Sequence, residues 1–329
     1  MRVGIVGASG AVGLEIIKLL ESRRFKLQSL SLFGSDRSAG RYLYFKKKKI
    51  KIKKLTKKGL ENLDLVFFSA GSRISKKFAN IAASYGAIVI DNSSAFRMNA
   101  DTPLIVPEIN PEDMEKTKSR IIANPNCTTI ISLMAIKPLY NLSKIRRIVA
   151  TSFQSVSGAG SRGIDELLSN TASLSKNKKT SNPIFKKQIA YNVIPKIGDF
   201  NSNLFSEEEM KLHNESRKIL SDKKINISAT TVRVPVIRSH SVSLNIEFTK
   251  SITIKRALKA LNQFSGIRIE PTSKGISFPT PIEATDKDYC IVGRLRKDFT
   301  RKNTLSLWVV GDQIRKGAAL NAVQIAELL

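Results

Sequence analysis

The chain opens with a pattern that few folds can accommodate. Arg2 to Val6 is a short apolar run, which predicts a buried strand, and Leu14 to Leu20 has apolar residues at helical spacing. The turn between them carries glycine at its first, fourth and seventh positions. Such a turn brings backbone N–H groups close to a pyrophosphate at a helix N-terminus. We therefore predict a Rossmann-type dinucleotide-binding domain whose phosphate site is formed by Gly7, Ser9, Gly10, Ala11, Val12 and Gly13.

Further apolar runs predict that a doubly wound parallel sheet continues from this start. Strands are expected at 27–33, 63–69 and 87–90, with a helix at 75–85 between the last two. The later strands end in small or polar residues, and the carboxyl ends of parallel strands form the edge where ligands bind. From this edge we expect cofactor contacts from Ser69, Gly71 and Asn92.

The residues after the second strand bear on the choice of nicotinamide cofactor. An acidic residue at this point usually binds the ribose hydroxyls of NAD, whereas an arginine accommodates the 2′-phosphate of NADP. Both types are present, as Asp36 and Arg37. Ser35, Arg37 and Ser38 together supply donors suited to a phosphate, so NADP is favoured. Because Asp36 is also present, NAD remains the alternative cofactor.

A strand-to-helix elbow in the middle of the chain carries the candidate nucleophile. The apolar run 121–123 is broken by Asn-Pro-Asn, because Pro125 fixes its own φ and disfavours helix at the preceding residue. Asn126 is a good N-cap, and 128–140 has apolar residues at helical spacing. Cys127 is thus expected in the first helical turn, where the helix dipole stabilises a thiolate. The alternative for Cys127 alone is a buried core cysteine.

The next part of the chain predicts a strand at 148–154, a flexible turn at 155–160 and a helix from about Ile164. A later helix, 206–221, is expected to begin at Ser206 as N-cap, with Glu209 at the capping-box position. Glu208 and Lys211 share one face of it. From spacing alone, a surface ion pair is the favoured interpretation for those two.

Only two histidines are available as a base near neutral pH. His213 is expected to be exposed on a charged helix, whereas His240 is expected at a turn between two strands. The first of those strands is predicted at 227–237, with Arg233 in its middle. Cys290 is interpreted as packing in an alternating strand, and 311–329 is predicted to form one last helix.

The net charge of +28 raises the question of nucleic-acid binding. Lysine is spread through the whole chain, however, and no recognised nucleic-acid-binding motif accompanies it. The densest cluster, 46–54, partly alternates like an edge strand, where lysine discourages aggregation. Weak attraction to polyanions is expected, without a dedicated nucleic-acid function.

Composition also bears on the compartment. No run approaches the roughly 18 apolar residues of a membrane span. Met1 leads directly into the first strand, so no signal peptide is expected. Two distant cysteines do not form a disulfide framework. A cytoplasmic protein without membrane association and without a bound metal ion is predicted.

Taken together, these motifs closely resemble the bacterial type of aspartate-β-semialdehyde dehydrogenase, essentially from end to end. Several of the matching segments are specific to that family, and their order along the chain is the family's own. They are Gly7 to Gly13, Arg37 to Gly40, Asp91 to Met98, Val106 to Asn110, Asn124 to Thr129, Gln154 to Gly160, Val232 to Val236 and Lys316 to Glu327.

The resemblance implies a role for each matching residue. It makes Cys127 the nucleophile that forms an acyl-thioester, His240 the acid/base and Gln154 the residue that orients the substrate. Arg233 would bind the substrate α-carboxylate and Glu208 its α-amino group. The phosphate site would comprise Arg97, Asn126 and Lys211, and further cofactor contacts would come from Ser157, Gly158 and Gln313.

The resemblance also implies the architecture and the reaction. An NADP-binding domain, 1–126, would be completed by a C-terminal helix, 311–329, and 127–310 would form an α+β catalytic and dimerisation domain with a mixed sheet. A homodimer would reduce L-aspartyl-4-phosphate to L-aspartate 4-semialdehyde and phosphate, for the synthesis of lysine, threonine and methionine.

Some alternatives remain open. The chain departs from the family at Val242, where glutamate is frequent, and at Gln313, where asparagine is common. Because Glu207, Glu208 and Glu209 are consecutive, any of them could bind the amino group. Rival functions are another acyl-phosphate reductase, such as N-acetylglutamyl-phosphate reductase, a non-catalytic homologue that acts as a binding protein, and a polyanion-binding protein.

Overall fold

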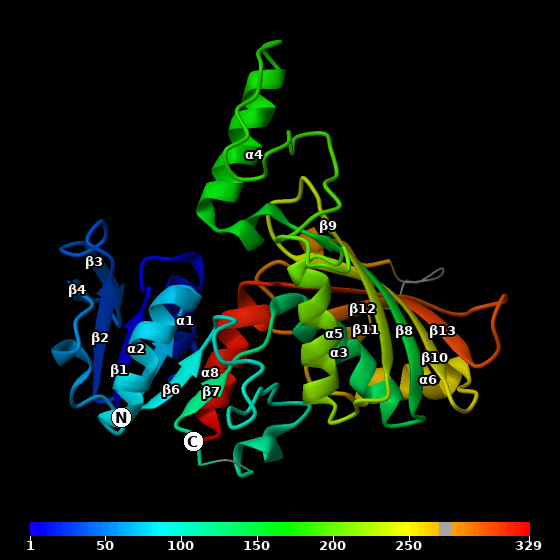
Figure 1. The fold of residues 1–329 in the computed structure, drawn as a ribbon, viewed down its shortest axis with the longest axis horizontal. Helices are drawn as coiled ribbons and strands as arrows, with labels where there is room; N and C mark the ends of the chain where they lie inside the picture. Colours follow the sequence, from blue (N-terminus) through cyan, green and yellow to red (C-terminus); the bar gives the residue numbers. More distant parts are fainter. Residues whose placement is uncertain (117, 270–277) are drawn as a thin grey trace. The chain divides into compact units, whose positions relative to one another are not determined.

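The computed structural model describes residues 1–116, 118–269 and 278–329, and the chain divides into two compact units. Unit 1 comprises Met1–Asn126 and Ala318–Leu329, and unit 2 comprises Cys127–Gly317 (Figure 1). Unit 2 is therefore one continuous segment, while unit 1 is made of two pieces of chain.

Unit 1 is built on a seven-stranded sheet in the order β3-β4-β2-β1-β5-β6-β7. All its strands run parallel except β3, which forms an antiparallel hairpin with β4. The strands are β1 Arg2–Val6, β2 Ser29–Gly34, β3 Tyr42–Phe45, β4 Lys48–Lys54, β5 Leu65–Phe68, β6 Ile88–Asp91 and β7 Ile121–Ala123. The chain leaves β1 toward β2 on one side and returns to β5 on the other, so the strand order reverses beside β1, where doubly wound folds bind ligands.

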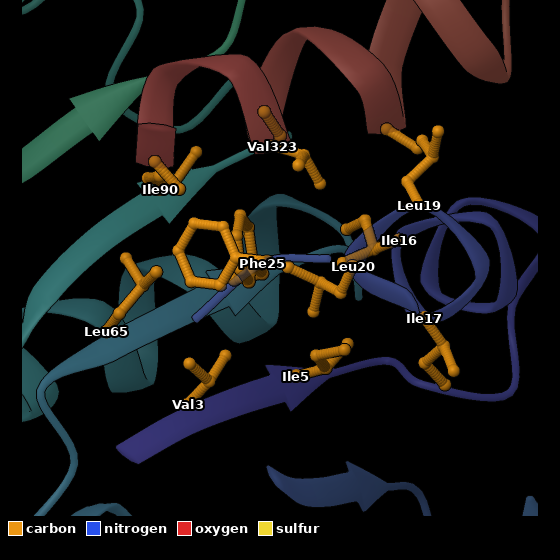
Figure 2. Packing of buried hydrophobic residues seen from close by; sticks show 14 of the residues in the cluster. Val3, Ile5, Ile16, Ile17, Leu19, Leu20, Phe25, Leu65, Ile90 and Val323 are labelled. Carbon is orange, nitrogen blue, oxygen red and sulfur yellow. The ribbon is translucent and has the colours of Figure 1, made fainter. Parts of the chain in front are cut away.

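Both faces of the central part of this sheet are covered, which explains why β1, β5 and β6 are almost continuously apolar. Leu65 and Phe67 of β5 join the cluster that includes α1 Ala11–Ser22 and α8 Leu320–Glu327, whereas Val66 and Phe68 join the cluster around α2 Ser72–Ser84. Figure 2 shows the first cluster, with side chains of α1, β1, β5 and β6 packed beside Val323 of α8. The C-terminal helix is therefore part of the core of unit 1.

Unit 2 contains a mixed six-stranded sheet in the order β11-β12-β13-β10-β8-β9. β8 pairs with β9 in parallel and β11 with β12 in parallel, while the other pairs are antiparallel. The strands are β8 Ile145–Gln154, β9 Asn226–Arg233, β10 His240–Phe248, β11 Ile267–Ile269, β12 Cys290–Lys297 and β13 Thr304–Gly311. The predicted fold class, a parallel Rossmann-type sheet plus a mixed-sheet domain, is confirmed.

Helices cover one face of this second sheet. α3 Cys127–Tyr140 packs against β10, β12 and β13, and α5 Glu207–Ile219 packs against β9 and α3. On the covered face, Ala150 and Leu244 are buried, whereas their neighbours on the opposite face, Thr151 and Ser243, are only half-buried. The sheet thus has one face closed by long helices and an opposite face that is largely open, where the short helix α7 packs near Trp308 and Val310.

The remaining elements connect these layers. They are η1 Lys58–Leu60, η2 Pro111–Met114, η3 Val156–Ala159, α4 Ser161–Leu174, α6 Ile254–Gln263, α7 Pro281–Ala284 and the π-helical turn η4 Arg315–Ala319. No helix within the described residues is both long and apolar enough to cross a membrane.

Two sequence predictions about unit 2 strands are corrected by the structure. Arg233 is the last residue of β9 and not its middle, because Pro235 has no N–H with which to extend the ladder. His240 is the first residue of β10 and pairs with Gly311 of β13. The turn lies one residue earlier, at Ser239, whose φ is 72°.

Three further predictions need adjustment. His213 is half-buried and bonded to a backbone oxygen, not exposed. Gly311 ends strand β13, so the last helical segment begins only at Arg315. The lysine-rich stretch 46–54 is the turn and second strand of the β3–β4 hairpin, with Lys46 and Lys47 at positive φ.

Candidate active site

The glycine-rich turn of unit 1 is shaped by close backbone approaches. Gly7 has φ 87°, and a Cβ there would lie 2.7 Å from the Ser69 carbonyl oxygen. A Cβ on Gly13 would lie 2.3 Å from the Gly7 carbonyl oxygen. No side chain caps the N-terminus of α1, so the N–H groups of its first turn can serve an anion. Ser9 and Gly10 are exposed at this turn.

A cavity of about 660 Å³ extends from this turn over the ends of β2 and β5. It is lined on one side by four basic side chains, those of Arg37, Lys54, Arg73 and Lys77, and by one acidic side chain. That acidic residue, Asp36, forms an ion pair of 2.7 Å with Lys54. Asp36, which would favour NAD, is therefore already paired with Lys54. The side chains that line the cavity still carry an excess of positive charge.

The other polar residues predicted at this edge of the sheet have defined places. Ser35 and Arg37 are exposed, whereas the buried Ser38 hydroxyl donates to the Ser35 carbonyl oxygen at 3.1 Å and so holds the turn. The Ser69 hydroxyl donates to the Val6 carbonyl oxygen at 3.1 Å. Gly71, with φ 85°, precedes α2.

Arg97 is buried at the ends of β6 and β7. Its Nε donates to the Asn124 carbonyl oxygen and its Nη2 to the Asn92 carbonyl oxygen, both at 2.9 Å. The Asn124 side-chain amide also donates to Asn92 Oδ1, at 2.9 Å. Backbone carbonyls thus hold the guanidinium in one orientation. Asn126, the last residue of this part of unit 1, is 7% exposed.

Cys127 is the first residue of α3 and is half-buried. The sequence places it in the first helical turn, and the structure agrees. Almost every residue of α3 from Thr128 to Leu139 is buried, so this helix has no exposed polar face. A Cβ on Gly317 would lie 2.9 Å from the Cys127 Cβ, so this glycine allows the chain to pass directly beside the thiol-bearing residue.

The end of β8 and the first turn of α5 bring three predicted residues together. The Gln154 amide nitrogen donates to Glu208 Oε1 at 3.2 Å, and Lys211 Nζ lies 3.3 Å from Glu208 Oε2. Glu208 is only 6% exposed, so this is not the surface ion pair that spacing favoured. The predicted capping box is confirmed, and the Glu209 carboxylate accepts hydrogen bonds from the backbone N–H groups of Ser206 and Thr231. Glu207 is exposed. Among the three consecutive glutamates, Glu208 is therefore the one that faces Gln154.

Arg233 is the last residue of β9 and His240 is the first residue of β10, both in unit 2. Arg233 is 6% exposed, and its Nη1 donates to the Ser155 carbonyl oxygen at 2.5 Å. Burial lowers the pKa of Arg233, while the negative charges of Glu208 and Cys127 oppose that shift. His240 is fully buried, and burial together with the positive charge of Arg233 lowers its pKa to about 3. His240 is therefore neutral at physiological pH.

Comparison with known proteins decides the family. Residues 2–117 match the NAD-binding domain of semialdehyde dehydrogenases, and residues 136–316 match their dimerisation domain. The aspartate-semialdehyde dehydrogenase of Prochlorococcus marinus is 45% identical over 329 residues, which cover 100% of this chain and 96% of that protein. The chain belongs to the aspartate-semialdehyde dehydrogenase family.

Solved structures of this family agree with the fold throughout. Aspartate semialdehyde dehydrogenase II from Vibrio cholerae superposes with a TM-score of 0.97 at 43% identity, covering 100% of this chain and 98% of that one. A second structure of that enzyme, complexed with ASA, gives a TM-score of 0.97 at 42% identity, with 100% and 97% covered. Membership of the family makes the chain an oxidoreductase of aspartate-family amino-acid biosynthesis with a NAD(P)-binding domain.

Three residues beside the family's predicted site residues were missed by the sequence analysis. Ser155 contacts His240 through both its backbone N–H and its hydroxyl, each at 3.1 Å. Ser239 donates its backbone N–H to Gln313 Oε1 at 2.7 Å. Gly317 lies beside Cys127. No sequence signal marks a backbone donor, although Gly317 within an otherwise helical segment was a visible anomaly.

Gly158, which the resemblance assigns to cofactor binding, also borders Arg233 and His240. A Cβ there would lie 2.8 Å from Arg233 Nη1 and 3.4 Å from His240 Nε2. We expect Gly158→Ala to lower kcat/KM for the aldehyde about 10²-fold. The added methyl group would displace Arg233 and His240, and a misplacement of groups in an active site by about 1 Å costs roughly that factor. Steady-state kinetics with saturating cofactor measures the effect.

The fold should tolerate the same change. Arg233 Nη1 is the far end of a flexible side chain and Gly158 is exposed, so the Tm from thermal unfolding should stay close to that of the wild type. A loss confined to cofactor affinity would contradict the expectation and place the role of Gly158 at the nicotinamide instead.

Proposed function

We propose that the chain reduces L-aspartyl-4-phosphate to L-aspartate 4-semialdehyde and phosphate, with NADPH as the hydride donor and a thioester on Cys127 as the intermediate. The observation that carries the proposal is a group of side chains in unit 2, in which buried Glu208 is bonded to both Gln154 and the half-exposed Lys211. The negative charges of Glu208 and Cys127 also act on the guanidinium of Arg233. A nucleophile, an amine ligand and a carboxylate ligand are thereby grouped within one rigid unit.

In the first step, the Cys127 thiolate attacks the acyl carbon of the mixed anhydride. The C–S bond forms, the carbonyl π electrons move to oxygen, and their return breaks the C–O bond to phosphate, which leaves with that electron pair. The helix N-terminus of α3 favours the thiolate that this step needs. We assign the phosphate to Arg97, Asn126 and Lys211, since a dianion is best held by cationic and N–H donors.

The second step reduces the thioester, and NADPH, when bound, would supply the hydride for it. Gln154 orients the acyl group. His240 contacts the carbonyl oxygen of that group, which gains negative charge when the carbon is reduced. Collapse of the tetrahedral adduct restores the C=O bond and returns the thiolate of Cys127.

The amino-acid end of the substrate requires two ligands of opposite charge. Arg233, at the rigid end of β9, suits the α-carboxylate, because a guanidinium can bind a carboxylate with two parallel hydrogen bonds. Glu208, buried and facing Gln154, suits the α-amino group. These two requirements favour aspartyl phosphate over an N-acylated acyl phosphate, which carries no free amine.

NADP is proposed as the cofactor in preference to NAD. The excess of basic residues around the cavity at the end of β2, and the pairing of Asp36 with Lys54, support a site for the 2′-phosphate. Ser35 and Arg37 are its proposed ligands, and Ser38 holds the turn that presents them.

Arg37→Ala should weaken NADP binding by about 1.5–3 kcal/mol, the scale of a hydrogen bond to a charged group, and leave NAD binding nearly unchanged. Fluorescence titration of both cofactors measures the two affinities. Lys47→Ala, which removes the same charge from the exposed β3–β4 turn, is the matched control and should alter neither. Equal losses for NADP and NAD would mean that Arg37 does not read the 2′-phosphate.

We further propose that the chain acts as a homodimer in the cytoplasm. The more open face of the unit 2 sheet carries Phe153 and Trp308 with ring centroids 5.4 Å apart, beside small polar residues and the short helix α7. A half-buried apolar pair of this kind suits a second copy of the same domain.

A single assay tests the proposed function. Aspartate semialdehyde, NADP and phosphate are supplied together, and the formation of NADPH is followed by its absorbance. Turnover that requires all three supports the proposal. Turnover with N-acetylglutamate semialdehyde instead would identify another acyl-phosphate reductase, and absence of turnover with both would overturn the assignment.

A further inference from the structure

The β3–β4 hairpin forms the outer edge of the unit 1 sheet (Figure 1). Side chains alternate between the two faces along both of its strands. Leu43, Phe45, Ile50 and Ile52 point inward and join the core cluster that contains side chains of α1. The side chains between them are exposed, so the second face of the hairpin is uncovered within the part of the chain that the structure describes.

Two tyrosines and three lysines make up this second face, which we call the hairpin face. Tyr42 and Tyr44 are 47% and 66% exposed, and they lie two positions apart on β3, about 7 Å along the strand. Cross-strand pairing places Lys51 opposite Tyr42 and Lys49 opposite Tyr44. Lys53 continues the same row on β4. The two rings are therefore bordered by a row of cationic side chains.

The positive charge of the hairpin face is not neutralised by its neighbours. Lys49, Lys51 and Lys53 form no ion pair with any residue that the structure describes, whereas the adjacent Lys54 is paired with Asp36. The segment 41–60 contains one arginine and nine lysines but no aspartate or glutamate. Lys49 Nζ instead lies over the Tyr42 ring, 4.5 Å from its centroid. The hairpin face thus combines high positive charge with exposed aromatic rings.

This combination matches what a single-stranded nucleic acid requires. Its phosphates need a line of cations, and its unpaired bases need flat rings on which to stack. Sheets that recognise RNA use the same arrangement, with aromatic side chains on an open face that stack on successive bases. A duplex hides the faces of its bases, and a polyanion without rings has none, so neither would use the tyrosines. A lipid surface would instead require a continuous apolar face.

We propose that the hairpin face binds single-stranded nucleic acid, with bases stacked on Tyr42 and Tyr44 and phosphates paired with the three lysines. The net charge alone predicted only weak attraction to polyanions, because lysines without rings give no preference for bases. The exposed tyrosines add that preference. None of the five residues of the hairpin face lines the cofactor cavity, so the inference is independent of the proposed enzymatic function.

Fluorescence anisotropy on the full chain measures the binding, with a labelled oligouridylate of about 12 nucleotides as the probe. We expect Tyr42→Ala and Tyr44→Ala each to raise the Kd about 10-fold, the scale of one lost base-stacking contact. Tyr44→Phe should bind as the wild type does. Tyr44→Leu keeps apolar bulk without a ring and should bind as weakly as Tyr44→Ala, while the Tm of each variant reports whether the fold is kept.

A matched control separates the hairpin face from any other exposed tyrosine. Tyr85, directly after α2, is 41% exposed and belongs to the same unit. Tyr85→Ala should therefore leave the Kd for the oligouridylate unchanged. An equal loss in Tyr85→Ala and Tyr44→Ala would overturn the assignment to the hairpin face.

The salt dependence separates phosphate contacts from stacking. For single strands, the slope of log K against log salt is about −0.7 for each neutralised phosphate. Lys51→Gln should therefore reduce the magnitude of the slope by about 0.7, whereas Tyr44→Ala should lower the affinity and leave the slope unchanged. Lys259→Gln, which removes one exposed charge from α6 in unit 2, is the control and should leave both unchanged.

Ultraviolet cross-linking locates the contact in the chain. Trypsin should release residues 42–46 as one peptide, because it cleaves after Arg41 and Lys46. We expect mass spectrometry to find the cross-linked nucleotide on this peptide, and saturating NADPH should not reduce the yield. Cross-links confined to the glycine-rich turn and abolished by NADPH would overturn the proposal, because the oligonucleotide would then occupy the cofactor site.

Comparison of ligands gives the remaining outcomes. A Kd that responds to neither tyrosine variant, with equally strong competition by inorganic polyphosphate, would mean that the lysines act by charge alone and serve to protect the edge strand. Tyrosine-dependent binding to phosphatidylserine vesicles without binding of the oligouridylate would assign the hairpin face to a lipid surface. Either result overturns the proposal. None of these measurements depends on catalytic turnover.

Discussion

Replacing Cys127 with alanine should lower turnover at least ~10⁴-fold, because without the thiolate no acyl-enzyme can form. Cofactor affinity should remain nearly that of the wild type, since the glycine-rich turn and the basic cavity belong entirely to unit 1. The phosphate-dependent assay measures the first quantity and fluorescence titration with NADPH measures the second. A loss of NADPH affinity as large as the loss of activity would contradict this separation.

The second cysteine provides the control for this result. Cys290 is fully buried at the start of β12, whereas Cys127 is half-buried at a helix N-terminus. Cys290→Ala should therefore retain turnover. A thiol-selective reagent should label Cys127 well before Cys290, because reactivity follows thiolate character and access. Equal rates of labelling would contradict a thiolate stabilised at the start of α3.

Arg233→Lys should raise the KM for aspartate semialdehyde about 10²-fold although the charge is retained, because lysine cannot form two parallel bonds to a carboxylate. In the structure the guanidinium also donates to the Ser155 carbonyl oxygen and lies over the Phe185 ring, 5.8 Å from its centroid. A lysine would lose both contacts. The KM for phosphate should change little in this variant.

Lys211→Ala is the matched comparison for Arg233→Lys. It removes a cation on the half-exposed side of Glu208, and we expect it to raise the KM for phosphate in the oxidative direction. Measuring both constants in both variants separates the two anion sites. Should Arg233→Lys alter only the phosphate constant, the substrate would lie in the opposite orientation.

The parts of the fold that depend on local chemistry could be predicted from the sequence. The glycine turn was predictable because Gly7 and Gly13 leave no room for a Cβ, and the capping box because Ser206 and Glu209 bond each other three residues apart. Cys127 was placed correctly because Pro125 ends the preceding strand. In each case, the residues that decide the structure are close in the sequence.

Features that depend on distant pairing could not be predicted in the same way. His240 became a strand residue because it pairs with Gly311, 71 positions away, and that pairing also removes Gly311 from the last helix. α3 is buried on nearly all sides, since β10, α5 and α6 pack around it, and the helical spacing of its apolar residues did not reveal these partners. The contact between the Ser155 amide and His240 is made by a backbone group, which the identity of the residue does not reveal.

The close approach of Gly317 to Cys127 has a consequence for chain topology. These two residues are the last and the first of unit 2, so that unit begins and ends at adjacent positions. Unit 1 closes on itself there, since the Asn124 side chain donates to the Ala318 carbonyl oxygen at 3.3 Å. In terms of architecture, unit 2 is an insertion with adjoining ends, the arrangement in which one domain can be accommodated within another without disturbing the host sheet. Cys127, the proposed nucleophile, is the first residue of the inserted segment.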